Sequence, residues 1–229
     1  MTRPQIVSRA KWLTARKALL AEEKAFTKAR DALSARRRDL PWVKIETPYE
    51  FEGPKGRESL AQLFGGKSQL IVYHFMYGAD WEQGCKSCSF WADNFNGIGS
   101  HLAARDAAII AISSAPFATL EAFRKRMGWQ FKWVSSAGTR FNRDFGVSPE
   151  PGQPLKYNYA TTVRQMDELP GISIFTRTDA GEVYHTYSCY SRGLDMLNGA
   201  YHFLDLLPKG RDEQDLPYAM SWVRHHDRY

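Results

Sequence analysis

The first forty residues carry apolar side chains at intervals of seven positions: Trp12, Leu19, Phe26, Leu33 and Leu40. This interval places them on one face of an α-helix. Ser8 before the pattern is a suitable N-cap and Pro41 ends it, so we predict one long amphipathic helix between them. We expect residues 1–41 to be a homodimerisation element that packs on the same helix or on the body of a second copy.

Two apolar runs in the rest of the chain predict buried strands. Residues 69–77 and 107–112 are continuous stretches rich in branched and aromatic side chains, typical of parallel strands covered on both faces. Helical spacing of apolar residues follows each run, over about residues 88–102 and 116–127. Strands that alternate with helices require right-handed crossovers and helices on both sides of the sheet.

The C-terminal half adds a hairpin and a last helix to this pattern. Residues 172–176 and 182–187 flank an Asp-Ala-Gly turn, which predicts two antiparallel strands, and helical spacing returns over about residues 194–204. The intervening residues 147–170 are proline-rich and irregular, so we predict a surface excursion. We therefore expect residues 42–229 to form one α/β domain with a C-terminal tail, a three-layer sandwich with a central mixed sheet.

Charge is distributed unevenly along the chain. The formal net charge is +6, of which residues 1–40 contribute +7 and the remainder −1. Because acidic residues interrupt the basic segment and no nucleic-acid motif accompanies it, we interpret it as a solvated helix face and expect no nucleic-acid partner. No apolar run approaches the roughly 18 residues that cross a bilayer, and the N-terminus has no apolar stretch suitable for a signal peptide. We expect a cytoplasmic protein without a membrane partner.

Two of the three cysteines stand three positions apart in WEQGCKSCSFWADNF, residues 81–95. In the cytoplasm, such a pair favours redox or metal chemistry over a structural disulfide. Cys85 ends the loop after the first long strand, and Cys88 falls in the first turn of the next helix. There, backbone N–H groups, the helix dipole and Lys86 are expected to lower the pKa of Cys85. The spacing is typical of thiol-disulfide exchange in which Cys85 attacks and Cys88 resolves.

The order of these features resembles the thioredoxin-like superfamily over about residues 42–207. The shared order is strand, loop, Cys-X-X-Cys, helix, strand, helix, then a proline before an antiparallel hairpin and a final helix. Here the proline is Pro170, in LPGISIFTRTDAGEV. The resemblance implies a cis proline that lies against the dithiol and offers backbone to an extended substrate. We therefore expect Pro170, together with Trp81 and Gly84 of the loop before the dithiol, to contact substrate.

A narrower resemblance covers nearly the whole chain, including the N-terminal helix. It rests on the stretches RRRDLPWV, LIVYHFMYG, GCKSCSFWADNF, SRGLDMLNGAYHFLDL and WVRHHDRY. They resemble an uncharacterised bacterial family, a domain of unknown function with a thioredoxin-like fold. This resemblance implies the fold and transfers no reaction.

The chain departs from thioredoxin and from peroxiredoxins beside the dithiol. Its loop over residues 78–84 is longer than that of thioredoxin and holds Asp80 and Glu82, a candidate proton relay. Peroxiredoxins carry Pro-X-X-X-Thr-X-X-Cys, and the places of proline and threonine are taken here by Gly78 and Glu82. A thiol peroxidase is therefore an alternative function and not the first hypothesis.

Two other interpretations of the cysteines remain open. With His185 and Cys189 the pair would make a Cys₃His zinc set, or all cysteines could be inert in a non-enzymatic thioredoxin-like scaffold. Our first hypothesis is a thiol-disulfide oxidoreductase in which Cys85 and Cys88 exchange a disulfide with a protein or small-molecule disulfide or thiol. We expect no metal and no bound cofactor. In particular we expect no nucleotide, because the glycines lack the spacing of phosphate loops.

Overall fold

The chain forms two compact units, an N-terminal helix within residues 1–41 and an α/β body over residues 42–229. The computed structural model describes residues 5–150, 153–162 and 166–229. None of the helices in these described ranges is both long enough and apolar enough to cross a membrane.

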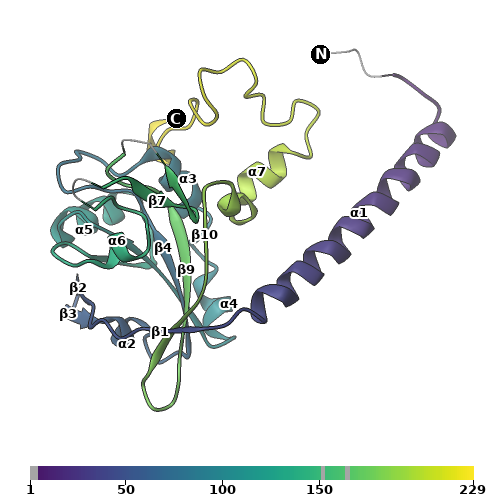
Figure 1. Cartoon of the computed structure of the whole chain (residues 1–229). Coiled ribbons are helices and arrows are strands. Elements are labelled where there is room, and N and C mark those ends of the chain that lie inside the picture. The colour runs from purple at the N-terminus through teal and green to yellow at the C-terminus, as the bar shows by residue number, and fades with distance from the viewer. Residues whose placement is uncertain (1–4, 151–152, 163–165) are drawn as a thin grey trace. The chain divides into compact units, whose positions relative to one another are not determined.

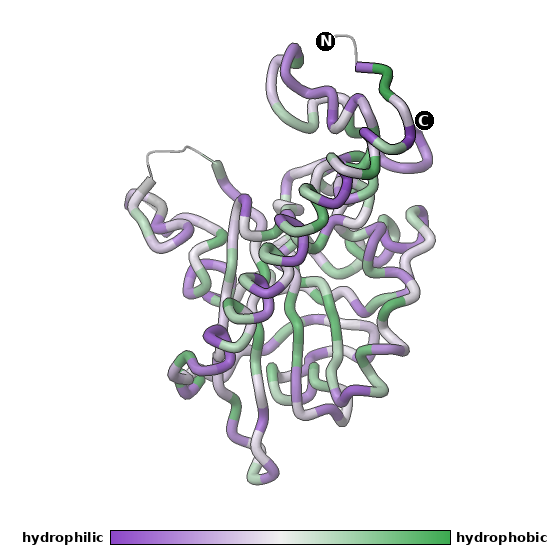
Figure 2. The backbone as a smooth tube through the Cα atoms, turned by 90° about the vertical axis from the view of Figure 1, so that its right-hand side faces the viewer, coloured by the Kyte–Doolittle hydropathy of each residue, from purple (hydrophilic) through white to green (hydrophobic). Residues whose placement is uncertain are grey.

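Helix α1 (Arg9–Arg38) begins and ends where the sequence predicts. The Ser8 hydroxyl accepts a hydrogen bond from the backbone N–H of Lys11, and Asp39 caps the other end. Hydrophobic and polar segments alternate along the helix (Figure 2). The side chains spaced seven apart are exposed, Phe26 most of all at 70%. Helix α1 therefore buries none of its own residues.

Eight strands form one mixed sheet in the body, in the order β1-β10-β9-β4-β5-β6-β2-β3 (Figure 1). They are β1 (Val43–Lys44), β2 (Glu50–Gly53), β3 (Gly56–Ser59), β4 (Gln69–His74), β5 (Ala107–Ser113), β6 (Lys132–Ser135), β9 (Gly171–Arg177) and β10 (Val183–Tyr190). A separate hairpin, β7 (Leu155–Tyr157) with β8 (Ala160–Thr162), lies between β6 and β9 in the chain.

The central strands β4, β5 and β6 run parallel, as their apolar runs predict. His74 of β4 lies opposite Ile112 of β5, and Ser113 of β5 lies opposite Ser135 of β6. Strand β9 pairs antiparallel with the other side of β4 and forms the predicted hairpin with β10. The carboxyl ends of the three parallel strands therefore meet at one edge of the sheet, where the cysteine loop begins.

Helices cover both faces of the sheet, which confirms the predicted three-layer α/β sandwich. Helices α3 (Lys86–Ala92), α5 (Phe117–Arg126) and α7 (Gly199–Leu204) contribute to one core cluster, and α2 (Leu60–Leu63) and α6 (Phe141–Asp144) contribute to the other. Strand β4 serves both cores because its side chains alternate between the faces. Tyr73 and Phe75 lie in the first cluster, whereas Leu70 and Val72 lie in the second.

Two predicted helices are interrupted, which corrects the sequence prediction. The helix after Cys88 stops before Gly97, whose φ of 85° favours glycine, and α4 (Gly99–Ala103) follows. The last predicted helix is a 3₁₀ helix, η1 (Ser191–Leu197), and then α7, which Asn198 caps. The apolar spacing continues across both breaks, so periodicity alone does not reveal them.

The segment predicted as a surface excursion over residues 147–170 is partly buried. Within it, residues 151–152 and 163–165 lie outside the described residues. Tyr157 and Leu169 form a small core cluster with Val147 and with Tyr190 of β10. The prediction is wrong for these residues because a proline-rich composition does not reveal long-range packing.

Candidate active site

The loop between β4 and α3 closes on itself and holds Cys85 near the end of β4. The backbone N–H of Cys85 donates to the Met76 carbonyl at 3.1 Å, and this hydrogen bond closes the loop formed by residues 77–84. Beyond the strand, the N–H of Phe75 donates to the Ile112 carbonyl and continues the β5 pairing. Cys85 therefore has a fixed position at the carboxyl edge of the sheet.

Cys85 is the N-cap of the seven-residue helix α3, and Cys88 lies in its first turn. The Cys85 sulfur accepts a hydrogen bond from the backbone N–H of Cys88 at 3.5 Å, and the Cys85 carbonyl accepts one from Ser89. Cys88 is 2% exposed, whereas Cys85 is only partly buried. No disulfide joins the two, so the structure shows the dithiol.

The surroundings of the two thiols move their pKa values in opposite directions. Contact with the Cys88 thiol, together with the N–H groups of Cys88 and Ser87, lowers the pKa of Cys85 to about 7 against an opposing effect of burial. Burial, and the nearby Cys85, raise the pKa of Cys88 well above its ordinary value. Lys86, which we expected to lower the pKa of Cys85, donates from its ammonium group to the Ser221 carbonyl at 3.1 Å.

Tyr73 is a site residue that the sequence analysis missed. Its hydroxyl donates to the Cys88 carbonyl at 3.4 Å, and burial raises its pKa well above the ordinary value, so it remains a neutral hydroxyl. The same hydroxyl lowers the pKa of Cys88. The alternation of β4 places Tyr73 on the face covered by α3, and that alternation is the signal that could have found it.

A cavity of about 330 Å³ opens beside the dithiol. Both cysteines line it, and most of its other walls are apolar or aromatic: Tyr73, Met76, Trp91, Tyr157, Met166, Leu169, Pro170, Leu194, Tyr201 and Met220. The walls come from β4, α3, the segment before β9, η1 and the C-terminal tail. Distant parts of the chain thus build an apolar chamber around two thiols.

Of the predicted substrate contacts, Pro170 lies in the wall of this cavity. The preceding peptide bond is trans, since the described residues contain no cis peptide, so the cis geometry implied by the resemblance is wrong here. The Pro170 carbonyl accepts a hydrogen bond from the Tyr157 hydroxyl at 2.7 Å, so its oxygen already has a partner within the protein.

Trp81 and Gly84 are placed differently from Pro170. The Trp81 ring packs on Gly78, where a β-carbon would meet its Nε1 at 2.8 Å. Gly84 is buried, and a β-carbon there would lie 2.9 Å from the Phe75 ring. Neither residue lines the cavity, so both shape the loop that carries Cys85.

The candidate proton relay of Asp80 and Glu82 lies at the surface. Both side chains are exposed, and neither lines the dithiol cavity. Glu82 contributes its backbone carbonyl, which accepts a hydrogen bond from the Tyr77 hydroxyl at 3.2 Å. A proton-relay role would therefore require these carboxylates to act through solvent.

Glu168 is a second residue that the sequence analysis missed. It is 5% exposed, and its carboxylate accepts hydrogen bonds from Ser114, Ser148 and Asn142. Burial raises its pKa to about 7. It directly precedes Leu169 in the cavity wall, but an acidic residue in a polar stretch gives no sequence signal of burial.

The alternative zinc set is not assembled. Cys189 shares a core cluster with Cys88, whereas His185 lies on the other face of the sheet, against Phe145 and Phe175. Across the described residues, no three histidine, cysteine, aspartate or glutamate side chains come together as metal ligands.

The C-terminal tail, residues 213–229, packs against the dithiol region. His225 Nε2 donates to the Gly84 carbonyl at 2.8 Å. Asp227, in the 3₁₀ helix η2 (His226–Arg228), accepts a bidentate pair of hydrogen bonds from Arg126. The tail thus holds the loop that precedes Cys85.

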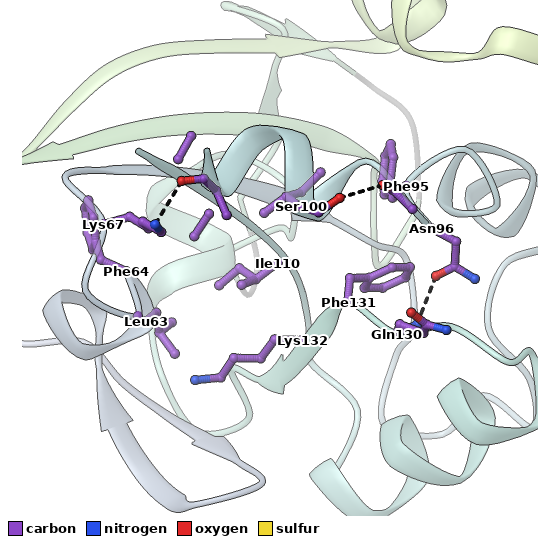
Figure 3. A pocket seen from close by; sticks show the side chains of 17 residues that line it. Leu63, Phe64, Lys67, Phe95, Asn96, Ser100, Ile110, Gln130, Phe131 and Lys132 are labelled. Atoms are coloured by element: carbon purple, nitrogen blue, oxygen red, sulfur yellow. Dashed lines mark hydrogen bonds between the residues drawn. The ribbon is translucent and has the colours of Figure 1, made fainter. Parts of the chain in front are cut away.

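A second cavity, of about 440 Å³, lies at the opposite end of the parallel strands (Figure 3). Its two lysines already have partners, since Lys67 donates to the Ala103 carbonyl and Lys132 to Glu58. None of the described residues that line it is a cysteine or a histidine. The dithiol cavity is therefore the better candidate for chemistry.

The fold is similar to those of solved peroxiredoxins. The peroxidoxin BcpB from Mycobacterium tuberculosis matches with a TM-score of 0.50 and 14% identity, covering 70% of this chain and 94% of that one. A variant of peroxiredoxin Q from Xanthomonas campestris matches with a TM-score of 0.50 and 13% identity, covering 72% and 98%. At this identity the likeness shows a thioredoxin-like fold alone and does not bear on activity.

Sequence comparison gives the family. None of the curated proteins is significantly similar to the chain. A family model described as "Bacterial protein of unknown function (DUF899)" matches residues 1–229, so the match includes α1 as well as the thioredoxin-like body. The chain therefore belongs to this bacterial family, as the resemblance of its five quoted stretches predicts.

Proposed function

We propose that the protein is a thiol-disulfide oxidoreductase in which Cys85 is the nucleophile and Cys88 the resolving thiol. The observation that carries the proposal is the asymmetry of the pair. Cys85 is partly exposed with a pKa of about 7, whereas Cys88 is buried with a raised pKa. Attack by thiolate requires a deprotonated and accessible sulfur, and only Cys85 meets both conditions near neutral pH.

The lowered pKa makes a modest contribution to rate. A fall from 9 to about 7 raises the thiolate fraction of Cys85 at pH 7 from about one hundredth to about one half. The intrinsic nucleophilicity falls about tenfold over two pKa units, so the net gain is roughly fivefold. The position of Cys85 beside a resolving thiol therefore matters more than its acidity.

Trapping the intermediate tests the two roles. In a Cys88→Ser protein, Cys85 should form a mixed disulfide that persists, whereas a Cys85→Ser protein should form none. Cys189→Ser is the matched control, because that cysteine shares the same core cluster but does not line the cavity. Absence of any mixed disulfide on Cys88→Ser would contradict the proposed role of Cys85.

A redox titration tests the pair as a unit. Mass spectrometry of the alkylated protein, equilibrated in graded thiol and disulfide buffers, should show one reversible two-electron step confined to Cys85 and Cys88. The same preparation, offered hydrogen peroxide, tests the thiol peroxidase alternative. Oxidation by peroxide at rates far above those of an ordinary thiol would favour that alternative, even though Gly78 and Glu82 replace the peroxidase motif.

We also propose that α1 pairs two copies of the chain. Its apolar side chains recur every seven residues and are exposed, which is the pattern of a helix that packs on a matching helix. Light scattering should give a dimer mass for the native chain and a monomer mass for Phe26→Glu. Lys24→Glu, an exposed change outside the apolar positions, should leave the dimer intact. A dimer of Phe26→Glu would place the interface elsewhere.

A further inference from the structure

The size of the dithiol cavity limits what can reach Cys85 through it. At about 330 Å³ it lies near the lower end of the roughly 300–1,000 Å³ typical of small-molecule pockets. Cys85 and Cys88 stand in the same wall as Trp91, Leu169 and Pro170. A small ligand held in the cavity would thus lie beside the sulfur that attacks, with apolar surface around it.

Among the described residues, the charged groups that line the cavity leave no free cation inside it. Among its described lining residues, only Arg192, Asp195 and Glu213 are charged, a formal sum of −1. Arg211 binds Asp195 through two 2.9 Å hydrogen bonds, and Glu213 accepts the Tyr201 hydroxyl at 2.7 Å. The Arg192 side chain is 81% exposed. Because Arg211 neutralises Asp195, the remaining formal charges of Arg192 and Glu213 cancel. An anionic ligand would therefore lose its solvation at an apolar wall without gaining an unpaired cation, which opposes binding.

The C-terminal tail occupies space that an extended polypeptide would need at the dithiol. Lys86 donates to the Ser221 carbonyl, His225 donates to the Gly84 carbonyl, and Met220 forms part of the cavity wall. The tail is thus attached on both sides of Cys85 in the sequence. A protein substrate could pair with this region only after displacing the tail, whereas a small molecule could enter the cavity.

We infer that the substrates of this dithiol are small, uncharged disulfides with an apolar or aromatic body, and not disulfides of folded proteins or anionic disulfides. This inference rests on the proposed function and names its substrate class. The Cys85 thiolate attacks one sulfur of R–S–S–R, so the Cys85–S bond forms and the first R–S⁻ leaves. Cys88 then loses its proton to solvent and attacks the Cys85 sulfur, which releases the second R–S⁻. The substrate is reduced to two thiols, the protein is oxidised to the Cys85–Cys88 disulfide, and a thiol such as dithiothreitol restores the dithiol.

Two chromogenic aromatic disulfides provide a matched pair of probes. Dithiodipyridine is uncharged at neutral pH, whereas dithiobis(nitrobenzoate) carries a carboxylate on each ring. Each rate with the reduced wild-type protein is divided by the rate with mercaptoethanol, a small neutral thiol, to remove intrinsic reactivity. The normalised rate should be at least about tenfold higher for the neutral probe, and insulin disulfides should be reduced more slowly than either. Equal normalised rates, or fast reduction of insulin, would overturn the inference.

A pair of neighbouring tail variants localises the selectivity. Ala219 is exposed and lines the cavity, whereas Tyr218 is exposed and does not. Ala219→Arg places bulk and positive charge at the wall, so it should slow the neutral probe and reduce the neutral-to-anionic ratio about tenfold. Tyr218→Arg adds the same charge one residue away and should change the ratio less than about twofold. Equal ratios in the two variants would show that the cavity does not select the substrate.

Mass spectrometry of the same reactions distinguishes a failure of the substrate class from a failure of the proposed oxidoreductase function. A Cys85–Cys88 disulfide formed equally well with both probes and with insulin would leave the proposed function standing and refute the substrate class. Failure to form that disulfide with any reagent would refute the proposed function itself.

Discussion

Replacement of Glu168 by glutamine tests whether a carboxylic acid is buried beside the dithiol cavity. Glu168 is 5% exposed and accepts hydrogen bonds from Ser114, Ser148 and Asn142. Burial raises its pKa to about 7 from an ordinary value of 4.5. Glutamine retains the shape and cannot ionise, so the variant removes one titration and little else.

The sign of the effect follows from proton binding in the two states. Between pH 4.5 and 7 folded Glu168 holds a proton that the unfolded chain has released, so this residue makes the free energy of unfolding fall as pH rises. The fall ends above pH 7, where both states are ionised. At about 1.4 kcal/mol per pKa unit, the loss between pH 5 and pH 8 is about 2 to 3 kcal/mol.

Urea unfolding of the wild type and of Glu168→Gln, each at pH 5 and pH 8, measures this loss of unfolding free energy as a difference between the two proteins. Wild-type protein should lose about 2 to 3 kcal/mol more than Glu168→Gln between the two pH values, because every other titration cancels in the comparison. Glu150→Gln is the control, because the Glu150 carboxylate pairs with Arg140 at the surface. Its free energy of unfolding should depend on pH as that of the wild type does. Parallel pH dependence of wild type and Glu168→Gln would refute a buried, protonated Glu168.

Three further predictions concern the dithiol itself. Tyr73→Phe removes the hydroxyl that lowers the pKa of Cys88. The mixed disulfide should therefore persist about two- to tenfold longer, while the rate of the first attack by Cys85 should be unchanged; stopped-flow kinetics measures both. Cys88→Ala removes the largest contribution that lowers the pKa of Cys85, so the midpoint of its alkylation against pH should rise above 7. Gly84→Ala brings a β-carbon within 2.9 Å of the Phe75 ring and should cost about 1 to 3 kcal/mol in urea unfolding; an unchanged midpoint would contradict the close packing.

Local patterns in the sequence were sufficient to predict the framework. The apolar runs before and after the cysteine loop gave β4 and β5, and Ser8 gave the start of α1, because these signals depend on neighbours in the chain. The position of Cys85 at the start of a helix followed from the same local reasoning. Pro170 lies with both cysteines in the cavity wall, as the thioredoxin-like resemblance implies, although its peptide bond is trans.

The rest of the site depends on contacts between distant segments. The engagement of Lys86 by the Ser221 carbonyl joins residues 135 positions apart, and no local pattern predicts it. The sequence around Glu168 suggests a solvated acid, and its burial becomes evident only from its partners Ser114, directly after β5, and Asn142 in α6. Asp80 and Glu82 were near Cys85 in sequence, yet their exposed side chains show that proximity along a loop does not bring side chains into a site.

The acidity of Cys85 also indicates where the selectivity of the proposed reaction must arise. A pKa of about 7 means that ionisation stabilises the reduced form at pH 7 by only about 0.4 kcal/mol, equivalent to roughly 10 mV in a two-electron couple. Such a shift is too small to distinguish one disulfide substrate from another. The apolar walls of a 330 Å³ cavity can make that distinction, because a charged or bulky ligand would have to lose its solvation or displace the C-terminal tail. Changes to the cavity wall at Ala219 should therefore alter substrate choice more than changes to the thiol pKa.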